Sequence, residues 1–516
     1  MTQWFNTAGP CQSDIHYMLP PTARLPNLKR LVAQRSYFVI HAPRQVGKTT
    51  AMLALAEELT ASGDYTAVMV SAEVGAGFSQ DPVQAERALL NDWRGTCEFR
   101  LPPELHPPEF QPSAGGGNIG AFLKAWAQAS VRPLVVLIDE IDALRDDVLI
   151  SILRQLRSGY PNRPRGFPQS LALIGLRDVR DYKVASGGSD RLGTASPFNI
   201  KVESLTLRNF TTAEVSQLYG QHTEATGQVF VPEVLSQVFE LSYGQPWLVN
   251  ALARELTENL VTDTSQPITL SHLHQAKENL IQRNDTHLDS LAERLREQRT
   301  RAILEPMLSG QDLKDVPQED LQFVIDLGLC RIDAQGGLVI ANPIYREVLP
   351  RSLAFVPRAA LPRIAPTWLN AAGELMPEAL LDAFLKFWRQ HGQPLLASAP
   401  YHEIAPHLVL MAFLHRVVNG GGTLEREYAI GTDRMDLCLR YGAVTLAIEL
   451  KVWRKGRPDP LKAGLEQLEG YLAGLGLNWG WLVIFDRRPG LPDIGERTTN
   501  EAAETATGRQ VTVIRG

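Results

Sequence analysis

The segment Tyr37–Thr50, with the sequence YFVIHAPRQVGKTT, constrains the fold of this chain more than any other. Its first residues form a short apolar run, which predicts a buried strand, and the AMLALAEEL that follows has the spacing of a helix. The polar residues between them therefore form a tight loop at a helix N-terminus. Because backbone N–H groups in such a loop converge on an anion, the segment predicts a phosphate-binding site.

The loop follows the spacing G-x-x-x-x-G-K-[ST], in which the lysine reaches the outer phosphates of a nucleotide and the hydroxyl holds Mg²⁺. Lys48 and Thr49 take these two positions. Ala42 stands where the motif has its first glycine, and alanine is small enough for the loop to form with less backbone freedom. The predicted nucleotide-binding residues of this segment are Ala42, Pro43, Arg44, Gln45, Val46, Gly47, Lys48, Thr49 and Thr50.

A second apolar run, LVVLIDEID from Leu134 to Asp142, ends in adjacent carboxylates. A buried strand that ends in a solvated acidic turn has the same pattern, but beside a phosphate loop the pattern favours an ATP site. Asp139 would then belong to the Mg²⁺ site through the water on the metal, and Glu140 would polarise the attacking water. Phosphoryl transfer depends on such positioning and charge neutralisation more than on covalent chemistry.

The two motifs resemble those of AAA-like and STAND-like P-loop ATPases over roughly the first half of the chain. The resemblance implies ATP as the cofactor and a further strand that ends in a sensing polar residue. LALIGLRD, from Leu171 to Asp178, fits that strand, with Arg177 as the sensor that contacts the nucleotide. Gly244-Gln245-Pro246 resembles the GxP segment of the helical lid that follows in STAND ATPases.

Composition places the 516-residue chain among ordinary globular proteins, with 44% hydrophobic and 21% charged residues. Its four scattered cysteines lack the spacing of disulfide pairs or of a metal site, which favours a reducing cytoplasm. The first residues, MTQWFNTAG, do not predict a signal peptide, and no apolar run is long enough to span a membrane. With a net charge of −6, any contact with nucleic acid must come from local basic patches.

Three other stretches of the chain predict an N-terminal segment, a basic loop and a winged-helix-like region. Residues 1–30 predict an extended segment over the ATPase domain, near the base of the nucleotide. The basic loop Arg154–Arg165 leaves an arginine finger, a DNA contact and a solvated turn open. LDSLAERLREQRTRAILEPML predicts one amphipathic helix, and the helix, strand, turn and strand predicted after it resemble a winged helix. Because its second helix is acidic, we favour a spacer or a protein contact over DNA binding there.

The C-terminal part predicts a second site. A helix, HEIAPHLVLMAFLHRVVN, precedes three strands, LEREYAI, RMDLCLRY and VTLAIELKVW, and a helix and the strand WGWLVIFD follow. Glu449 and Lys451 lie two residues apart in the third strand and therefore share one face. A short turn joins the second and third strands, so Asp436 can lie beside Glu449. A structural ion pair is the alternative, although charges in an apolar strand are costly unless they are paired or used.

This constellation resembles the PD-(D/E)XK nuclease superfamily over residues 381–490. The resemblance implies a Mg²⁺ ion, with Mn²⁺ as the alternative, held by hard carboxylate oxygens and activating a water for attack on a phosphodiester. Lys451 would orient that water or stabilise the transition state, and Gln467 with Tyr471 matches a Q-x-x-x-Y signature of some branches. The implied residues are the metal ligands Glu403, Asp436 and Glu449 and the catalytic candidates Asp436, Glu449, Lys451 and Gln467.

The sequence thus predicts an α/β multidomain protein: a P-loop ATPase core with a parallel sheet (1–205), a helical lid (206–283), a winged-helix-like domain (284–356), a linker (357–380) and an α-β-β-β-α-β nuclease-like domain (381–516). The leading interpretation is a cytoplasmic ATP switch joined to a metal-dependent nuclease that cleaves nucleic acid, DNA in the first instance. Fusions of this kind are often tied to defence against foreign DNA or to mobile elements. An ATP-controlled scaffold with an inactive nuclease-like domain is the alternative, and a ring-forming motor is a third, so the oligomeric state stays open.

Overall fold

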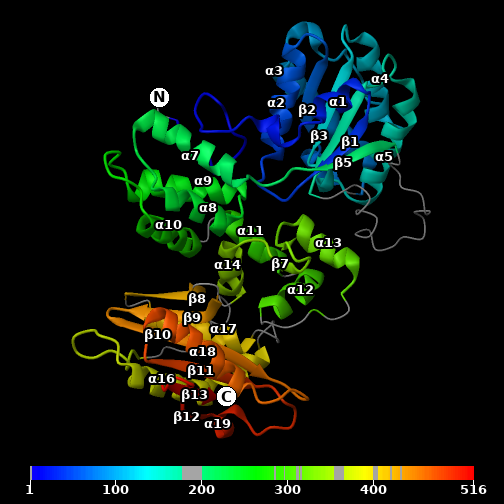
Figure 1. The fold of residues 1–516 in the computed structure, drawn as a ribbon. Coiled ribbons are helices and arrows are strands. Elements are labelled where there is room, and N and C mark those ends of the chain that lie inside the picture. The colour runs from blue at the N-terminus through cyan, green and yellow to red at the C-terminus, as the bar shows by residue number, and fades with distance from the viewer. Residues whose placement is uncertain are drawn as a thin grey trace. The chain divides into compact units, whose positions relative to one another are not determined.

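The computed structural model describes residues 3–78, 80–176, 200–283, 286–295, 297–308, 313, 316–353, 365–398, 405–418, 421–430 and 433–516. The internal contacts of the chain divide it into two compact units. Unit 1 comprises Met1–Arg283 with Gln322–Asn342, and unit 2 comprises Asn284–Leu321 with Pro343–Gly516. Each unit is built around its own large sheet (Figure 1).

Unit 1 holds a five-stranded parallel sheet in the order β2-β3-β4-β1-β5. Its strands are β1 (Tyr37–His41), β2 (Thr66–Ser71), β3 (Leu134–Asp139), β4 (Ser170–Gly175) and β5 (Lys201–Thr206). One strand, β4, separates β1 from β3, the strands of the two predicted motifs. Because the carboxyl ends of parallel strands share one edge, the phosphate loop and the acidic residues meet there. This sheet, with a phosphate loop after β1, has the fold of a P-loop NTPase.

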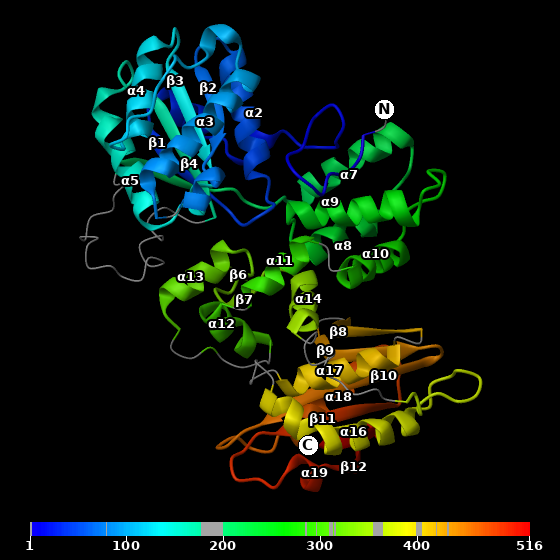
Figure 2. The ribbon, with the colours of Figure 1, turned by 180° about the vertical axis from the view of Figure 1, so that it is seen from behind.

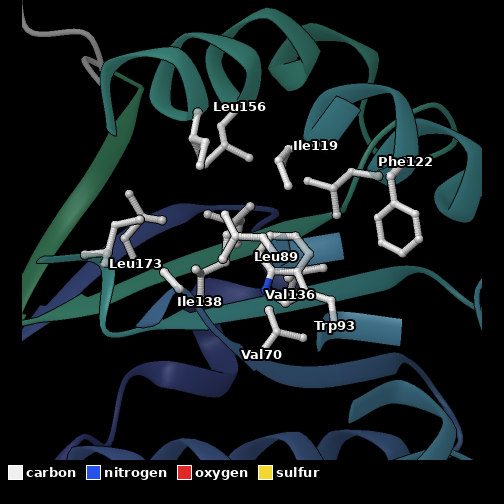
Figure 3. Packing of buried hydrophobic residues seen from close by; sticks show 14 of the residues in the cluster. Val70, Leu89, Trp93, Ile119, Phe122, Val136, Ile138, Leu156 and Leu173 are labelled. Atoms are coloured by element: carbon white, nitrogen blue, oxygen red, sulfur yellow. The ribbon is translucent and has the colours of Figure 1, made fainter. Parts of the chain in front are cut away.

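Helices cover both faces of this sheet (Figure 2), which is why its central strands β3 and β4 are buried on both sides. On one face lie α1 (Leu28–Ala33) and α2 (Lys48–Ala61), and on the other lie α3 (Pro82–Arg100), α4 (Asn118–Ala129) and α5 (Asp146–Gly159). Figure 3 shows Trp93 and Phe122 of the second layer in the same buried cluster as Val136 of β3. Short 3₁₀ helices are η1 (Pro21–Arg24), η2 (Glu73–Phe78), η3 (Pro103–Leu105), η4 (Ile141–Ala143) and η5 (Tyr160–Asn162).

Residues 206–283, predicted as a lid, are mainly helical. They form α7 (Thr212–Thr226), α8 (Pro232–Ser242), α9 (Pro246–Arg254), the π-helical η7 (Glu255–Leu260) and α10 (Leu270–Arg283). A capping box starts α7, since the Thr211 hydroxyl accepts from the Glu214 N–H while the Glu214 carboxylate accepts from the Thr211 N–H. The polar start of this helix is therefore fixed by its own sequence.

The single helix predicted over residues 288–308 is wrong. Two helices, α11 (Thr286–Arg294) and α12 (Gln298–Leu308), occupy this stretch. At the break, the Arg294 guanidinium pairs with the Glu297 carboxylate at 2.8 Å, and the Glu297 carbonyl accepts the first hydrogen bond of the next helix. Apolar spacing alone does not reveal such a break, because both helices keep the same periodicity.

Further along, α13 (Gln318–Asp326) precedes an antiparallel hairpin of β6 (Cys330–Ile332) and β7 (Leu338–Ile340), and α14 (Pro343–Leu353) follows. The predicted order of helix, strand, turn and strand is present. Contacts assign residues 322–342, with the hairpin and most of α13, to unit 1, and assign α12 and α14 to unit 2. The winged-helix domain over 284–356 therefore stays a prediction.

Unit 2 holds a six-stranded mixed sheet in the order β12-β13-β11-β10-β9-β8. Its strands are β8 (Gly422–Ile430), β9 (Asp433–Tyr441), β10 (Val444–Trp453), β11 (Trp479–Asp486), β12 (Thr499–Glu504) and β13 (Gln510–Arg515). One face packs on α16 (Pro377–Ser398), α17 (Ala405–Val418) and α19 (Ile494–Arg497), and the other packs on α18 (Leu461–Leu475). The predicted order of helix, three strands, helix and strand is present as α17, β8, β9, β10, α18 and β11.

Part of the predicted linker 357–380 contributes to the core of unit 2. Trp368 and Leu375 are buried there, and the Trp368 ring meets that of Phe413 with centroids 5.8 Å apart. Residues 354–364 lie outside the described part of the chain. Among the residues that the structure describes, no helix is both long and apolar enough to cross a membrane.

Candidate functional site

The phosphate loop after β1 has a backbone suited to an anion. Gln45 and Gly47 are left-handed, with φ of 58° and 94°, and α2 begins at the next residue, Lys48. A Cβ on Gly47 would lie 3.0 Å from the Arg24 guanidinium, so this position favours glycine both for its backbone and for space. Ala42, at the position of the motif's first glycine, is buried, and its N–H donates to a carbonyl at the end of β4.

Lys48 is held inside the loop by backbone carbonyls. Its Nζ donates to the Ala42 carbonyl at 2.8 Å and to the Pro43 carbonyl at 2.9 Å. Burial lowers the pKa of Lys48, while the carboxylates of Asp139 and Glu140 act in the opposite direction. A phosphate oxygen is a stronger acceptor for an ammonium group than a neutral carbonyl, so a bound nucleotide can take over this Nζ.

The acidic residues after β3 lie beside the loop. The Thr49 hydroxyl donates to Asp139 Oδ2 at 2.7 Å, and the Glu140 N–H donates to Asp139 Oδ1 at 2.9 Å. Glu140 is left-handed, with φ of 55°, which turns the chain sharply after Asp139. Burial raises the pKa of Glu140, and the carboxylates of Asp142 and Asp139 raise it further. Hard oxygens of Thr49 and Asp139 therefore lie side by side, and this donor set fits Mg²⁺.

A cavity of about 630 Å³ opens next to the loop. This volume lies within the range of small-molecule sites. Its walls come from the N-terminal segment, the loop, α7 and the start of α9, and include Cys11, Met18, Arg44, Thr50, Gln217 and Trp247. Glu140 and Asp142 line the same cavity, so the phosphate loop and the acidic residues face one space.

The N-terminal segment lies over this cavity, as the sequence predicts. The Cys11 N–H donates to the Thr50 hydroxyl at 3.1 Å, which ties the segment to α2. Met18 and Gln221 of α7 exchange two hydrogen bonds, of 3.1 Å and 3.0 Å. The Trp247 indole N–H donates to the backbone carbonyl of Thr7 at 2.9 Å. The segment therefore joins the sheet domain to the lid helices.

Arg24 and Glu73 are two of the cavity-wall residues that were not predicted. Arg24 donates from its guanidinium to the Val46 carbonyl in the loop at 2.8 Å and lies over the Phe210 ring, 4.8 Å from its centroid. Glu73 follows β2 at the same sheet edge and also lines the cavity. The shared edge of parallel strands could have pointed to Glu73, whereas no sequence pattern marks Arg24.

Other predicted residues of unit 1 fare differently. β4 is the strand predicted to carry the sensor, but Arg177 lies outside the described residues. Gly244 is left-handed, with φ of 66°, and a Cβ there would lie 1.9 Å from the Phe210 carbonyl oxygen, so the GxP segment requires its glycine. In the basic loop, Arg163 stacks on the Tyr160 ring, 3.3 Å from its centroid, which is a packing role.

In unit 2, the predicted cluster comes together on the face of the sheet that α18 covers. β9 and β10 pair with Leu437 opposite Ile448, and continuing this register puts Asp436 opposite Glu449. Asp436 Oδ2 accepts from the Leu450 N–H at 2.8 Å, and Lys451 Nζ donates to Glu449 Oε1 at 2.5 Å. The turn and the i+2 spacing thus bring these three side chains to one place.

Glu449 is almost fully buried, with 2% of its surface exposed. Burial and the neighbouring Asp436 carboxylate raise the pKa of Glu449 to about 8, although Lys451 acts in the opposite direction. Its Oε2 has no hydrogen-bond partner among the described residues. A buried oxygen without a partner, beside a second carboxylate, fits a cation or a proton. Within the described residues, no three His, Cys, Asp or Glu side chains form a group that could hold a metal.

The remaining predicted residues of this cluster are Glu403, Gln467 and Tyr471. Glu403, the third predicted metal ligand, lies outside the described residues. Gln467 lies on α18 with an exposed side chain, and its catalytic role stays a prediction. Tyr471, one turn later on α18, is buried in the core beneath the sheet.

Comparisons with known proteins give structural similarity only. No protein-family model matches the chain, and no curated protein sequence matches it. A Walker-type ATPase of Pyrococcus abyssi is similar in structure, with 13% identity and a TM-score of 0.47, over 67% of this chain and 99% of that one. The ORC1 protein of Aeropyrum pernix in complex with DNA gives 15% identity and a TM-score of 0.35, over 66% of this chain and 95% of that one.

The RuvB Holliday junction branch migration motor of Thermotoga maritima gives 13% identity and a TM-score of 0.34, over 61% of this chain and 89% of that one. Similarity at this level describes the course of the backbone. The chemistry of the site therefore rests on the contacts of Lys48, Thr49 and Asp139 within unit 1.

Proposed function

We propose that unit 1 binds and hydrolyses ATP. The observation that carries this proposal is the hydrogen bond between Thr49 and Asp139, next to the loop-bound Lys48 and a cavity of nucleotide size. Lys48 and the N–H groups at the start of α2 would bind the phosphates. The Thr49 hydroxyl would hold Mg²⁺ directly, and Asp139 would hold it through a water molecule bound to the metal. The ion would neutralise phosphate charge. Glu140 would orient the attacking water.

Calorimetry with ATP on Lys48→Ala tests this proposal. The variant loses a charge from the phosphate cradle, so binding is expected to weaken at least about tenfold, or about 1.4 kcal/mol. Lys29→Ala is the matched control, because Lys29 is an exposed lysine on α1 that pairs with Glu58 at 2.8 Å. Equal affinity of Lys48→Ala and the control would refute the nucleotide assignment.

We further propose that unit 2 is a divalent-metal-dependent nuclease, with DNA as the first substrate to test. The support is the convergence of Asp436, Glu449 and Lys451, with an unpartnered buried oxygen on Glu449. Two carboxylates so close repel each other unless a cation or a proton lies between them. Mg²⁺ or Mn²⁺ would supply that charge and activate water, and Lys451 would then turn from Glu449 to the phosphate.

Two variants separate this proposal from a structural ion pair. Asp436→Ala is expected to lower cleavage by at least about 100-fold and to remove most of the Mn²⁺ affinity, while Lys451→Ala keeps the metal and loses cleavage. Lys462→Ala, on the exposed side of α18, is the control. Assays use single- and double-stranded substrates, with and without ATP. If wild-type protein binds neither metal and cuts no DNA or RNA in any nucleotide state, the ATP-controlled scaffold takes its place.

The two activities would be coupled by nucleotide state. Gly328, before β6, lies against the phosphate loop, since a Cβ there would be 2.7 Å from Pro43 Cβ. Arg331 of the same hairpin lies over the Tyr243 ring, 3.8 Å from its centroid, just before the GxP segment. The hairpin thus touches both the loop and the lid. A nucleotide that reorders either part would move the hairpin and bias unit 2.

A further inference from the structure

Trp453 ends β10 on the same face as Lys451, two residues away. The strand rise puts their Cα atoms about 7 Å apart. The Arg488 guanidinium lies over the Trp453 ring, 3.5 Å from its centroid, and Arg515 approaches at 5.8 Å. The Arg487 N–H donates to the Trp453 carbonyl at 2.8 Å, which joins the turn after β11 to the end of β10. An aromatic ring that carries a guanidinium group therefore adjoins the proposed cleavage centre.

Three arginines gather at this end of the sheet. Arg488 pairs with Asp486 at 2.7 Å. Burial lowers the pKa of Arg497; Asp486 opposes this, and the charges of Arg487 and Arg488 lower the pKa further. The Nε of Arg497 is buried and has no hydrogen-bond partner among the described residues. Like charges held together with an unpartnered donor are stabilised by an added anion.

The neighbouring acidic residues compensate these charges only in part. Arg515 pairs with Asp459 at 3.0 Å and with Glu501 at 3.2 Å, and Asp493 adds a second carboxylate near Arg497. Arg487, and Lys455 and Arg457 from the loop after Trp453, are exposed and add positive charge. We use the name Trp453 surface for the surface formed by Trp453, Lys455, Arg457, Arg487, Arg488 and Arg497.

We propose that the Trp453 surface binds the phosphate backbone of a nucleic-acid strand. The bound strand would then lie next to the proposed cleavage centre of Asp436, Glu449 and Lys451. The proposal rests on the nuclease function proposed above for the position of the scissile phosphate. Guanidinium groups bind phosphates in bidentate fashion, and the Trp453 ring holds the Arg488 guanidinium in place beside the proposed cleavage centre. The overall charge of the chain is negative, so this local excess of positive charge would set the docking position.

Fluorescence anisotropy of the full chain with a labelled oligonucleotide, in EDTA so that no strand is cut, tests this inference. Lys455→Glu with Arg487→Glu changes two exposed residues and is expected to weaken binding at least about tenfold. The slope of log affinity against log salt should fall by about 2, one for each lost phosphate contact. Lys29→Glu, which changes an exposed lysine on α1 of unit 1, is the matched control and should leave both quantities unchanged.

The outcomes separate this surface from the nuclease function. Unchanged affinity and salt slope in the double variant, an equal loss in the control, or no binding by wild-type protein would each overturn the Trp453 surface. Glu449→Gln should bind the oligonucleotide like wild type while it loses cleavage in Mg²⁺. If wild type binds through this surface but cuts no substrate, the nuclease function fails and the binding surface stands.

Discussion

The two candidate sites differ in how their lysines are satisfied. Lys48 donates to two neutral backbone carbonyls. Glu140 and Asp142 line the same cavity as Lys48, while the buried Asp139 accepts from the Thr49 hydroxyl. Lys451 instead donates directly to the buried Glu449 at 2.5 Å. The site in unit 1 is open to a ligand that carries negative charge. The site in unit 2 already contains its own counter-charge.

The partners of the two lysines differ in how strongly they call for a ligand. Neutral carbonyls are weak partners for an ammonium group, so the arrangement around Lys48 is explained best by a ligand that replaces them. A Glu–Lys bridge is self-sufficient, and burying one can serve structure alone. In unit 2 the bridge leaves one buried oxygen, the Glu449 Oε2, without a hydrogen-bond partner among the described residues. The Asp436 carboxylate lies beside it and raises the pKa of Glu449, and these two features support a function beyond structure.

Glu140→Gln tests whether the site in unit 1 is catalytic. Glu140→Gln should keep ATP bound but slow hydrolysis by about 10²–10⁴-fold, because the attacking water loses its orienting carboxylate. Phosphate release and ATP calorimetry on the same protein measure the two quantities. Asp142→Asn is the comparison variant, since Asp142 lines the same cavity and accepts from the Leu176 N–H. Hydrolysis at the wild-type rate in Glu140→Gln, with loss in Asp142→Asn, would move the role to Asp142.

The sequence was sufficient where local pattern determines structure. The strand predicted from Tyr37 is β1, the acidic strand is β3, and Glu449 and Lys451 share a face because strand spacing is strictly two. These features depend on residues that are neighbours in the chain. The order of helices and strands in unit 2 was predicted for the same reason, because the apolar residues of each element show the spacing of a helix or of a strand.

The parts that sequence reasoning missed depend on contacts between distant residues. Arg24 reaches the Val46 carbonyl and the Phe210 ring, and Gly328 meets Pro43, yet no spacing in the chain marks either pair. The last two strands, β12 and β13, were also not predicted. The first four residues of β12 are all exposed, so the strand lacks the alternation of apolar and polar residues that would distinguish its sequence from a loop.

The pH dependence of stability distinguishes a protonated Glu449 from an ionised Glu449 that pairs with Lys451. Folded Glu449 has a pKa of about 8, above its unfolded value of about 4.3. Between these values the folded chain keeps a proton that the unfolded chain has lost, so protonation favours folding there. The free energy of unfolding should therefore fall as pH rises through this window, by at most about 1.4 kcal/mol per pH unit, and level off above it.

Urea unfolding of wild type and Glu449→Gln across this pH range isolates the contribution. The glutamine variant cannot titrate, so the difference between the two proteins should shrink or reverse with rising pH. Added Mn²⁺ at pH 8 should stabilise wild type and leave Glu449→Gln unchanged, because the metal replaces the proton. If the difference in free energy of unfolding between the two proteins is the same at every pH, Glu449 stays ionised beside Lys451. The bridge in unit 2 would then be a plain structural ion pair, unlike the contacts of Lys48.

The smallest effect concerns the link from the open site to the hairpin of β6 and β7. Gly328→Ala should weaken ATP binding about two- to fivefold, or up to about 1 kcal/mol, because the new Cβ would lie 2.7 Å from Pro43 Cβ and displace the phosphate loop. Gly336→Ala is the matched control: its φ of 86° is strained like the 75° of Gly328, but a Cβ there meets no atom within 4 Å. Both variants lose similar stability through backbone strain, so only the contact with Pro43 separates them. Calorimetry with ATP that gives the two variants one affinity would remove the hairpin from the coupling between nucleotide and unit 2.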